Sequence, residues 1–410
     1  MKQRILAIDG NYFFHRALGQ LNMGDEINNL ETEKEQNKFW ATLNQGIVTL
    51  YQTFNNDKHQ LINNIVFVVD NWSWRKEVEP HRPYYINEIE TTPIKYKEQR
   101  RATKEKSTIN YDNFDIIINK FTNHLKDKLN VLDVRGLEGD DNLMLISEKL
   151  GNSNTNIEVI VFCTDGDLDQ IVKNNIFLFR NIRSKNCPNG EFVITNQKYT
   201  ELFDSKVSAF LKDNSSEIEY KKLFNIMIGD TTGNNKIVRS LNTGISVATP
   251  FRTALVKSVC GDKKDNLFSI LSWKSKTGTI NYKITENHLT KALAIHGLYL
   301  TENTCKNILT DKESIYNLLL ALKEVTKQTD VDVKVMAQHL KHNLKLNVLS
   351  KYNVPEQYLL DWDIEWNKIY IDLMKNFDEN RLKLFQQNKY IKDNAIDVFN
   401  NSIPDELKNI

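Results

Sequence analysis

The sequence is poor in the features that mark secreted, zinc-binding and membrane proteins. It has four cysteines in 410 residues, and no two of them have CxxC spacing, which argues against a disulfide framework or a thiolate zinc site. No apolar run approaches the roughly 20 residues that cross a bilayer. Asp9, His15 and Arg16 interrupt the apolar N-terminal stretch, so it does not predict a signal peptide. We expect a cytoplasmic protein, in the host cytoplasm if the source is viral, with no membrane partner.

The chain also lacks a large net charge and a glycine-rich nucleotide loop. Its formal net charge is +1, so any binding of nucleic acid must come from local patches of charge. The absence of a P-loop or a dinucleotide fingerprint leaves the use of ATP or NAD without support. The length allows roughly two or three domains of about 150 residues each, and we expect a monomer.

Carboxylates follow several of the apolar runs that the sequence does contain. Runs at 5–8, 65–69 and 157–163 have the length of buried strands, and each is followed by an aspartate. The alternation of strands and helices predicts a parallel α/β sheet with helices on its faces. In such a sheet the carboxyl ends of the strands converge on one edge, where ligands bind. The acids that we expect there are Asp9, Asp70, Glu138, Asp140, Asp141, Asp165, Asp167, Asp262 and Asp265.

A group of acids of this size is costly, because like charges raise each other's pKa and repel. A divalent metal ion is the usual reason to keep such a group. Oxygen ligands, with few histidines and no thiolate cluster, favour Mg²⁺ or Mn²⁺ over zinc. Each acid alone could still be a turn residue, or a helix cap in the case of Asp140. Residues 229–234 imitate the pattern of residues 261–266 but lack its second carboxylate, so we favour Asp262 and Asp265.

A basic segment at 94–106 follows Asp70. It carries six cations and two acids, and on a helix four of the cations (Lys97, Arg100, Arg101 and Lys104) would share one face. Aromatic residues are interleaved with it, which is the composition of an element that binds single-stranded nucleic acid: Trp72, Trp74, Tyr84, Tyr85 and Tyr96. A solvated helix face is the alternative. We expect residues 77–94 to form a loop.

The remaining segments predict the following organisation. Residues 19–37 are polar and are expected to form a loop, whereas 38–54 and 111–129 have helical periodicity, and the chain is almost wholly helical from about 285. We expect an α/β core at 1–180 that includes the basic segment. A less regular region would occupy 181–285, and a helical region 286–410.

The ordered motifs resemble those of the 5′-nuclease family, which includes flap endonucleases and the 5′→3′ exonuclease domains of bacterial DNA polymerases. They are Ile8-Asp9-Gly10-Asn11, Val69-Asp70-Asn71, Glu138-Gly139-Asp140-Asp141, Thr164-Asp165-Gly166-Asp167 and Gly261-Asp262-Lys263-Lys264-Asp265-Asn266. The last motif and the Leu267-Phe268-Ser269-Ile270 after it look most similar to ribonuclease H of T-even bacteriophages. The resemblance implies a PIN-like parallel sheet flanked by helices, with a helical C-terminal region. It also implies that 71–110 forms a clamp over the active site. Residues 181–285 would hold an insertion, around 200–250, and a degenerate helix–three-turn–helix region with the second-metal motif at 261–266.

The resemblance also implies two Mg²⁺ ions, with Mn²⁺ as a substitute. The first would be held by Asp9, Asp70, Glu138, Asp140 and Asp165, and the second by Asp167, Asp262 and Asp265, with Asp141 bridging or holding water. Tyr96-Lys97-x-x-Arg100 resembles a signature of the family's arch, so Lys97 and Arg100 would touch the scissile phosphate or its neighbour. Asp9, Asp70, Asp140 and Asp165 complete the catalytic set. The expected contacts to nucleic acid are Lys95, Lys97, Arg100, Arg101, Lys104, Lys263, Lys264, Lys274 and Lys276.

The implied function is hydrolysis of RNA or DNA from 5′ ends or at flaps, to remove RNA primers from lagging-strand fragments. The implied partners are DNA, RNA–DNA hybrids, 5′-flap or forked duplexes and a single-stranded-DNA-binding protein. A haloacid-dehalogenase-like phosphatase would need a second acid where Asn11 stands. The other alternative is a non-catalytic protein of DNA replication that binds DNA structures with the same fold.

Overall fold

The computed structural model describes most of the chain. The described residues are 3–24, 27–56, 59–60, 62–79, 95–151, 156–181, 190–195, 244–274, 280–282, 284–328, 331–375, 377–378, 381 and 385. Lys276, the imitation motif at 229–234, most of the expected loop at 77–94 and most of residues 200–250 lie outside them. Within these ranges no helix is long and apolar enough to cross a membrane.

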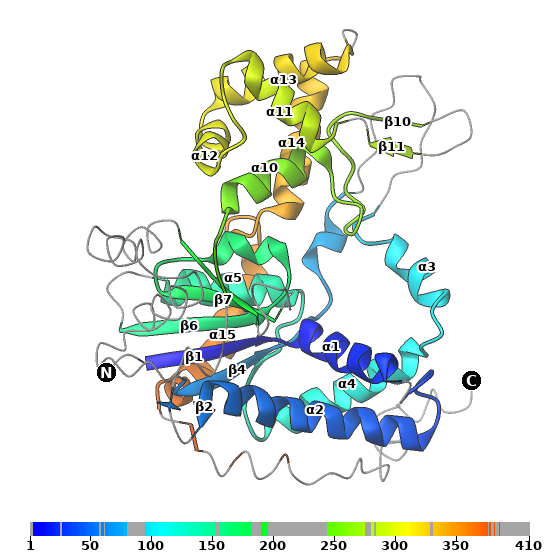
Figure 1. The fold of residues 1–410 in the computed structure, drawn as a ribbon, viewed down its shortest axis with the longest axis vertical. Helices are drawn as coiled ribbons and strands as arrows, with labels where there is room; N and C mark the ends of the chain where they lie inside the picture. The colour runs from blue at the N-terminus through cyan, green and yellow to red at the C-terminus, as the bar shows by residue number, and fades with distance from the viewer. Residues whose placement is uncertain are drawn as a thin grey trace, which may run out of the picture. The chain divides into compact units, whose positions relative to one another are not determined.

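The chain forms two compact units, of which the first comprises Met1–Phe13, Thr53–Lys106 and Leu129–Phe377. A seven-stranded sheet forms the centre of this first unit (Figure 1). Its order is β5-β4-β1-β6-β7-β8-β9, and every neighbouring pair is parallel except β7 with β8. This mostly parallel sheet confirms the predicted α/β class. Its strands are β1 (Gln3–Asp9), β4 (Asn64–Val68), β5 (Asn130–Leu132), β6 (Ile157–Cys163), β7 (Ile176–Arg180), β8 (Glu191–Ile194) and β9 (Gly244–Val247).

The register of β1 with its neighbours explains why the acids meet. Ile5 pairs with Asn64 of β4 and with Val159 of β6, and the three strands run in the same direction. All three are almost completely buried, because their continuous apolar runs are covered on both faces. Their carboxyl ends therefore lie side by side.

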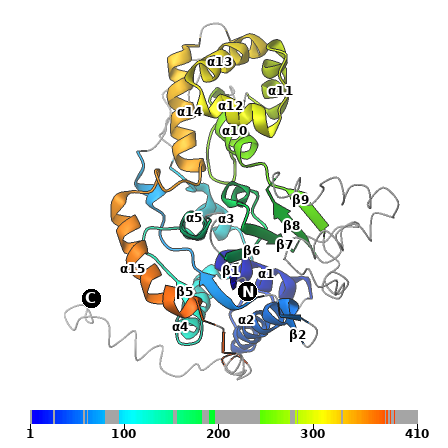
Figure 2. The ribbon, with the colours of Figure 1, turned by 90° about the vertical axis from the view of Figure 1, so that its left-hand side faces the viewer.

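Two helices pack directly on this part of the sheet. Helix α5 (Gly139–Leu150) contacts β1, β4 and β6, and α15 (Glu356–Leu373) contacts β4 and β5. Trp362 and Trp366 of α15 stack on each other within the core. Figure 2 shows both helices beside the strands. The expected helical C-terminal region thus contributes α15 to the layer that covers the sheet.

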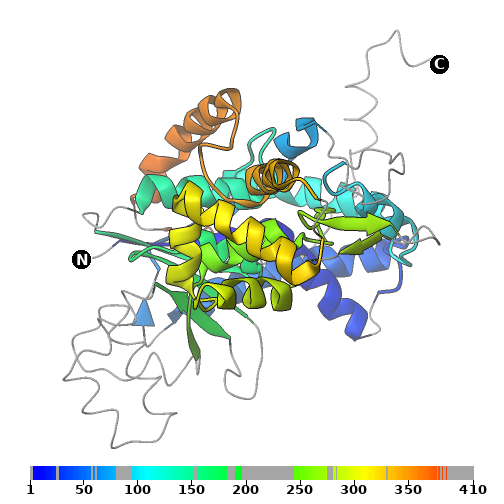
Figure 3. The ribbon, with the colours of Figure 1, turned by 90° about the horizontal axis from the view of Figure 1, so that it is seen from above.

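The other C-terminal helices form a second hydrophobic core, seen from above in Figure 3. Leucines at 255, 289, 318 and 322 and Met336 lie in this core. The helix at 250–260 was not predicted. The helices are α10 (Pro250–Cys260), α11 (Glu286–Ile295), α12 (Glu302–Thr310), α13 (Lys312–Thr326) and α14 (Val333–Asn347).

The second compact unit comprises Phe14–Gln52, Ser107–Lys128 and Asp378–Ile410, and the first comprises the rest of the chain. Helices α1 (Gly10–Met23), α2 (Glu33–Phe54) and α4 (Tyr111–Lys126) supply the second unit. The expectation of a loop at 19–37 was wrong at both ends. Helix α2 begins early because Thr32 and Glu35 form a capping box, in which each side chain accepts a hydrogen bond from the other residue's backbone.

Short elements complete the described chain. They are β2 (Asn55–Asn56), β3 (His59–Gln60), the 3₁₀ helices η1 (Trp74–Glu77) and η2 (Gly166–Ile171), α3 (Gln99–Glu105), and the antiparallel pair β10 (Ser272–Lys274) and β11 (Ile280–Tyr282). The stretch after residue 270 therefore contains a strand where we expected a degenerate helical motif.

Candidate active site

Strand ends and one helix start deliver four aspartates to the same edge of the sheet. Asp9 is the last residue of β1, while Asp70 and Asp165 each follow the end of their strand by two residues. Asp140 lies in the first turn of α5. We call Asp9, Asp70, Asp140 and Asp165 the first acidic group.

The backbone of α5 approaches the first acidic group very closely. The Gly139 N–H donates a hydrogen bond to Asp70 Oδ1 at 2.5 Å. A Cβ at position 139 would lie 2.6 Å from the same oxygen and 3.9 Å from Asp9 Oδ1. A side chain at this position would therefore displace the Asp70 carboxylate, which favours glycine.

The first acidic group is not neutralised. Burial, followed by the charges of Asp70 and Asp165, raises the pKa of Asp9 to about 7. Burial and the neighbouring acids likewise raise the pKa of Asp140 well above its usual value. Within the described ranges, none of the four aspartates forms an ion pair with a lysine, arginine or histidine. Such a site fits a divalent cation, since oxygen ligands and excess negative charge are what Mg²⁺ binds.

A second acidic group consists of Asp167, Asp262 and Asp265, which offer ligand atoms within 4.8 Å of one another. Asp167 comes from η2, and the other two come from the loop that follows α10. The structure therefore brings together the three residues predicted to serve a second ion.

Lys257, in the last turn of α10, lies against this second group. Its Nζ is 2.5 Å from an oxygen of Asp167 and 2.7 Å from Asp262 Oδ2. Burial raises the pKa of Asp167 to about 6 although Lys257 acts to lower it. For Asp262 burial is outweighed, and hydrogen bonding to Lys257 lowers the pKa below its usual value.

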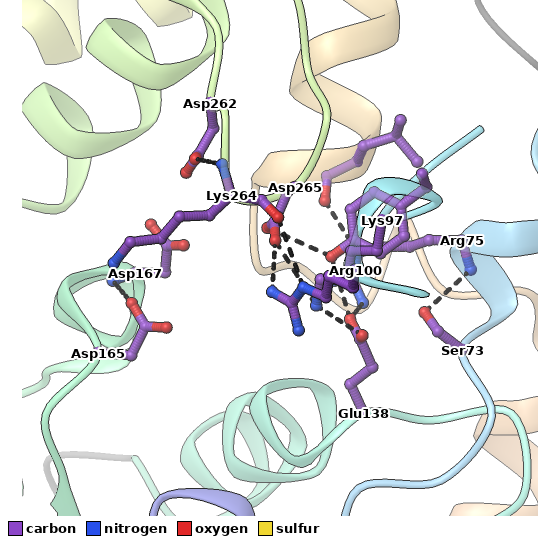
Figure 4. Close-up of polar contacts among 12 residues, drawn as sticks. Ser73, Arg75, Lys97, Arg100, Glu138, Asp165, Asp167, Asp262, Lys264 and Asp265 are labelled. Carbon is purple, nitrogen blue, oxygen red and sulfur yellow. Dashed lines mark hydrogen bonds and ion pairs between the residues drawn. The ribbon is translucent and has the colours of Figure 1, made fainter. Parts of the chain in front are cut away.

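The base of the predicted clamp contacts the same loop (Figure 4). The Lys97 N–H donates to the Asp265 carbonyl oxygen, and Arg100 Nη2 lies 2.8 Å from Asp265 Oδ1. Lys97 Nζ donates to Glu138 Oε1 at 2.6 Å. Burial would raise the pKa of Glu138, but Lys97 and then Arg75 lower it to about 2. Two segments far apart in the sequence thus meet over the start of α5.

Asp141 does not play its expected role. Its side chain is completely buried, and both of its oxygens accept hydrogen bonds at 2.7 Å from the Arg75 guanidinium. Trp74 Nε1 also donates to it, at 3.2 Å. An acid enclosed in this way cannot bridge an ion or hold water above the first acidic group, so that prediction is wrong.

The clamp prediction needs two further corrections. Lys97 precedes α3 and has a φ of +55°, so it does not share a helix face with Arg100 and Lys104. Trp74 and Tyr96 are buried, which removes them as surfaces for stacking bases, whereas Trp72 is 42% exposed. Lys95, Lys104, Lys263 and Lys264 are exposed as expected. The side chains of Arg101 and Lys274 lie outside the described residues.

Two cations at the site were missed by reasoning from the sequence. Lys257 stands one helical turn before the Gly261-Asp262 motif, and that spacing was a usable signal. Arg75 follows Asp70 by five residues in a stretch without regular periodicity. It reaches Asp141, Glu138 and the Leu346 carbonyl oxygen, and no local pattern indicates these partners.

Comparison with known proteins gives structural neighbours only. No protein-family model matches the chain, and no curated protein matches it. The bacteriophage T5 5′-exonuclease with bound zinc aligns over 92% of this chain and all of its own, at 13% identity and a TM-score of 0.44. The bacteriophage T5 flap endonuclease, in a pseudo-enzyme–product complex with DNA and metal ions, aligns over 91% of this chain and all of its own, at 15% identity and a TM-score of 0.45.

Similarity at this level does not by itself establish a shared fold or family, so the functional assignment depends on the site. The more specific resemblance to the ribonuclease H of T-even bacteriophages remains a prediction from the sequence.

Proposed function

We propose that this chain is a divalent-metal-dependent nuclease that hydrolyses RNA or DNA from 5′ ends or at 5′ flaps, with primer removal in DNA replication as its role. The observation that carries the proposal is the meeting of two acidic groups at the carboxyl edge of the sheet, beside Lys97 and Arg100 of the basic segment. Acids for metal ions and cations for phosphates are the two needs of phosphodiester hydrolysis.

The two acidic groups are the residues that would hold the ions. Asp9, Asp70, Asp140 and Asp165 would hold one Mg²⁺ or Mn²⁺, and Asp167, Asp262 and Asp265 a second. Two divalent ions held there would supply activation of a water molecule and stabilisation of charge on the leaving oxygen. Glu138, whose oxygens accept hydrogen bonds from Lys97, Arg75 and Tyr96, positions Lys97 in this proposal and is not an ion ligand.

The chain's own cations would orient the substrate. Lys97 and Arg100, which pair with Glu138 and Asp265, would contact the scissile phosphate or the next one. Lys95, Lys104, Lys263 and Lys264 would contact the phosphate backbone of a DNA, RNA–DNA hybrid or flap substrate, and such contacts weaken as salt increases.

Asp165→Asn tests the proposal most directly. We expect the wild-type protein to release short 5′-labelled products from an RNA–DNA hybrid and from a 5′-flap duplex with Mg²⁺, and none with EDTA. The Asp165→Asn variant should bind both substrates but lose turnover by orders of magnitude. Asp361→Asn, an exposed acid on α15, is the matched control and should retain activity.

Other outcomes decide against parts of the proposal. Full activity of Asp165→Asn would remove the first acidic group from the active site. Retained binding without cleavage by the wild-type protein would favour a non-catalytic protein that recognises DNA structure.

A further inference from the structure

The Lys257 ammonium lies against two of the three carboxylates of the second acidic group. It lies within 2.7 Å of carboxylate oxygens on both Asp167 and Asp262. These two acids belong to different segments, and Lys257 joins them. In the described part of the chain its ammonium makes ion pairs with these two acids alone.

The second acidic group is already largely neutralised by the chain's own cations. Lys257 and Arg100 together offset two of its three negative charges. A divalent ion that approaches while Lys257 and Arg100 remain in place is repelled by both of them. This repulsion cancels most of the attraction that the three acids exert on the ion. The first acidic group, with no ion-paired cation, presents no such obstacle.

Lys257 is held less firmly than Arg75, a buried cation of the site. The Arg75 side chain is 3% exposed and bonds to two acids and a backbone carbonyl. The Lys257 side chain is 25% exposed and ends in a single ammonium on a flexible four-carbon stem. Its ammonium can therefore swing into solvent and be hydrated, and the largely buried carboxylates of Asp167 and Asp262 that it leaves would then need another cation.

From this geometry we propose that Lys257 is a tethered cation that competes with the second divalent ion, so that the second acidic group binds metal only when the Lys257 ammonium is displaced. This rests on the proposed function. Binding of a divalent ion to the first acidic group would then require no movement of a side chain, whereas binding to the second would require Lys257 to move. The two ions would bind with clearly different affinities.

Metal binding by the full-length, metal-stripped protein tests the competition. We would titrate Mn²⁺ and follow free Mn²⁺ by electron paramagnetic resonance in wild type, Lys257→Met and the control Lys291→Met. Lys291 stands on α11, is exposed and has no ion pair within the described ranges. We expect Lys257→Met to tighten the weaker class of Mn²⁺ site about tenfold or more, and Lys291→Met to change it less than about twofold. Adding Asp262→Asn to Lys257→Met should abolish the gain.

The opposite results are equally informative. If Lys257→Met lowers the melting temperature and leaves the weaker Mn²⁺ class unchanged, Lys257 is a structural link between η2 and the loop after α10, and the inference is wrong while the nuclease proposal stands. If neither the wild-type protein nor Lys257→Met binds Mn²⁺, both the inference and the metal-dependent function fail.

A second measurement needs no substitution, so it holds even if the variant folds poorly. Reductive methylation of wild-type lysines, read by mass spectrometry, should label Lys257 slowly in EDTA and several-fold faster in saturating Mg²⁺. Lys149, paired with Asp363 on the surface, should react equally in both conditions. Equal labelling of Lys257 in the two conditions contradicts displacement.

Discussion

The two acidic groups lie at the same edge of the sheet, yet they are electrostatically different. Asp9, Asp70, Asp140 and Asp165 have no ion-paired cation among the described residues, and burial with mutual repulsion raises the pKa of Asp9 and Asp140. Asp167, Asp262 and Asp265 are each paired with a lysine or arginine of the chain. The first group is therefore neutralised only by protons or by an added cation, whereas the second is already paired with cations of the chain.

Asp141 is completely buried and is paired with Arg75. Replacing Arg75 is therefore expected to have the largest effect on stability. Arg75→Met should lower the free energy of unfolding by about 3–5 kcal/mol, because it leaves Asp141 buried and unpaired. Urea denaturation measures the change. Lys149→Met, which breaks a surface pair, should cost about 0–1 kcal/mol. A loss for Arg75→Met as small as that of the surface control would show that Asp141 does not need this cation.

A smaller effect is expected where the backbone touches the first group. Gly139→Ala should lower turnover about tenfold to a hundredfold, because the new Cβ displaces Asp70 Oδ1. Gly166→Ala is the matched control, since a Cβ there meets no atom within 4 Å although it stands between Asp165 and Asp167. Initial rates on the flap substrate give the comparison, and equal rates for the two variants would contradict the close packing at Gly139.

The last prediction concerns pH. The pKa of Asp9 is raised in the folded protein, so the folded state binds this proton more tightly than the unfolded chain does. The free energy of unfolding of metal-free protein should therefore fall as pH rises from about 4 to about 7. Denaturation in EDTA across this range measures the slope. Saturating Mg²⁺ or Asp9→Asn should flatten it, and an unchanged slope in Asp9→Asn would assign the proton elsewhere.

Local patterns in the sequence predicted the strands well and the partners of the acids poorly. The runs at 5–8, 65–69 and 157–163 became β1, β4 and β6 within one or two residues, because a buried parallel strand needs a short continuous apolar run. The start of α2 was missed although Thr32 and Glu35 carried a capping signal. The clamp was read as one continuous helix face, whereas the left-handed backbone at Lys97 separates that residue from α3.

By itself, the sequence determined which residues end the strands and hence which acids reach the edge of the sheet, because hydrophobic periodicity is a local property. Only the tertiary structure decided which of those acids are neutralised. Arg75 meets Asp141 across 66 residues, and Lys257 meets Asp167 across 90. Ion pairs over such separations depend on how the elements pack in space, and no local preference of the chain encodes those distances.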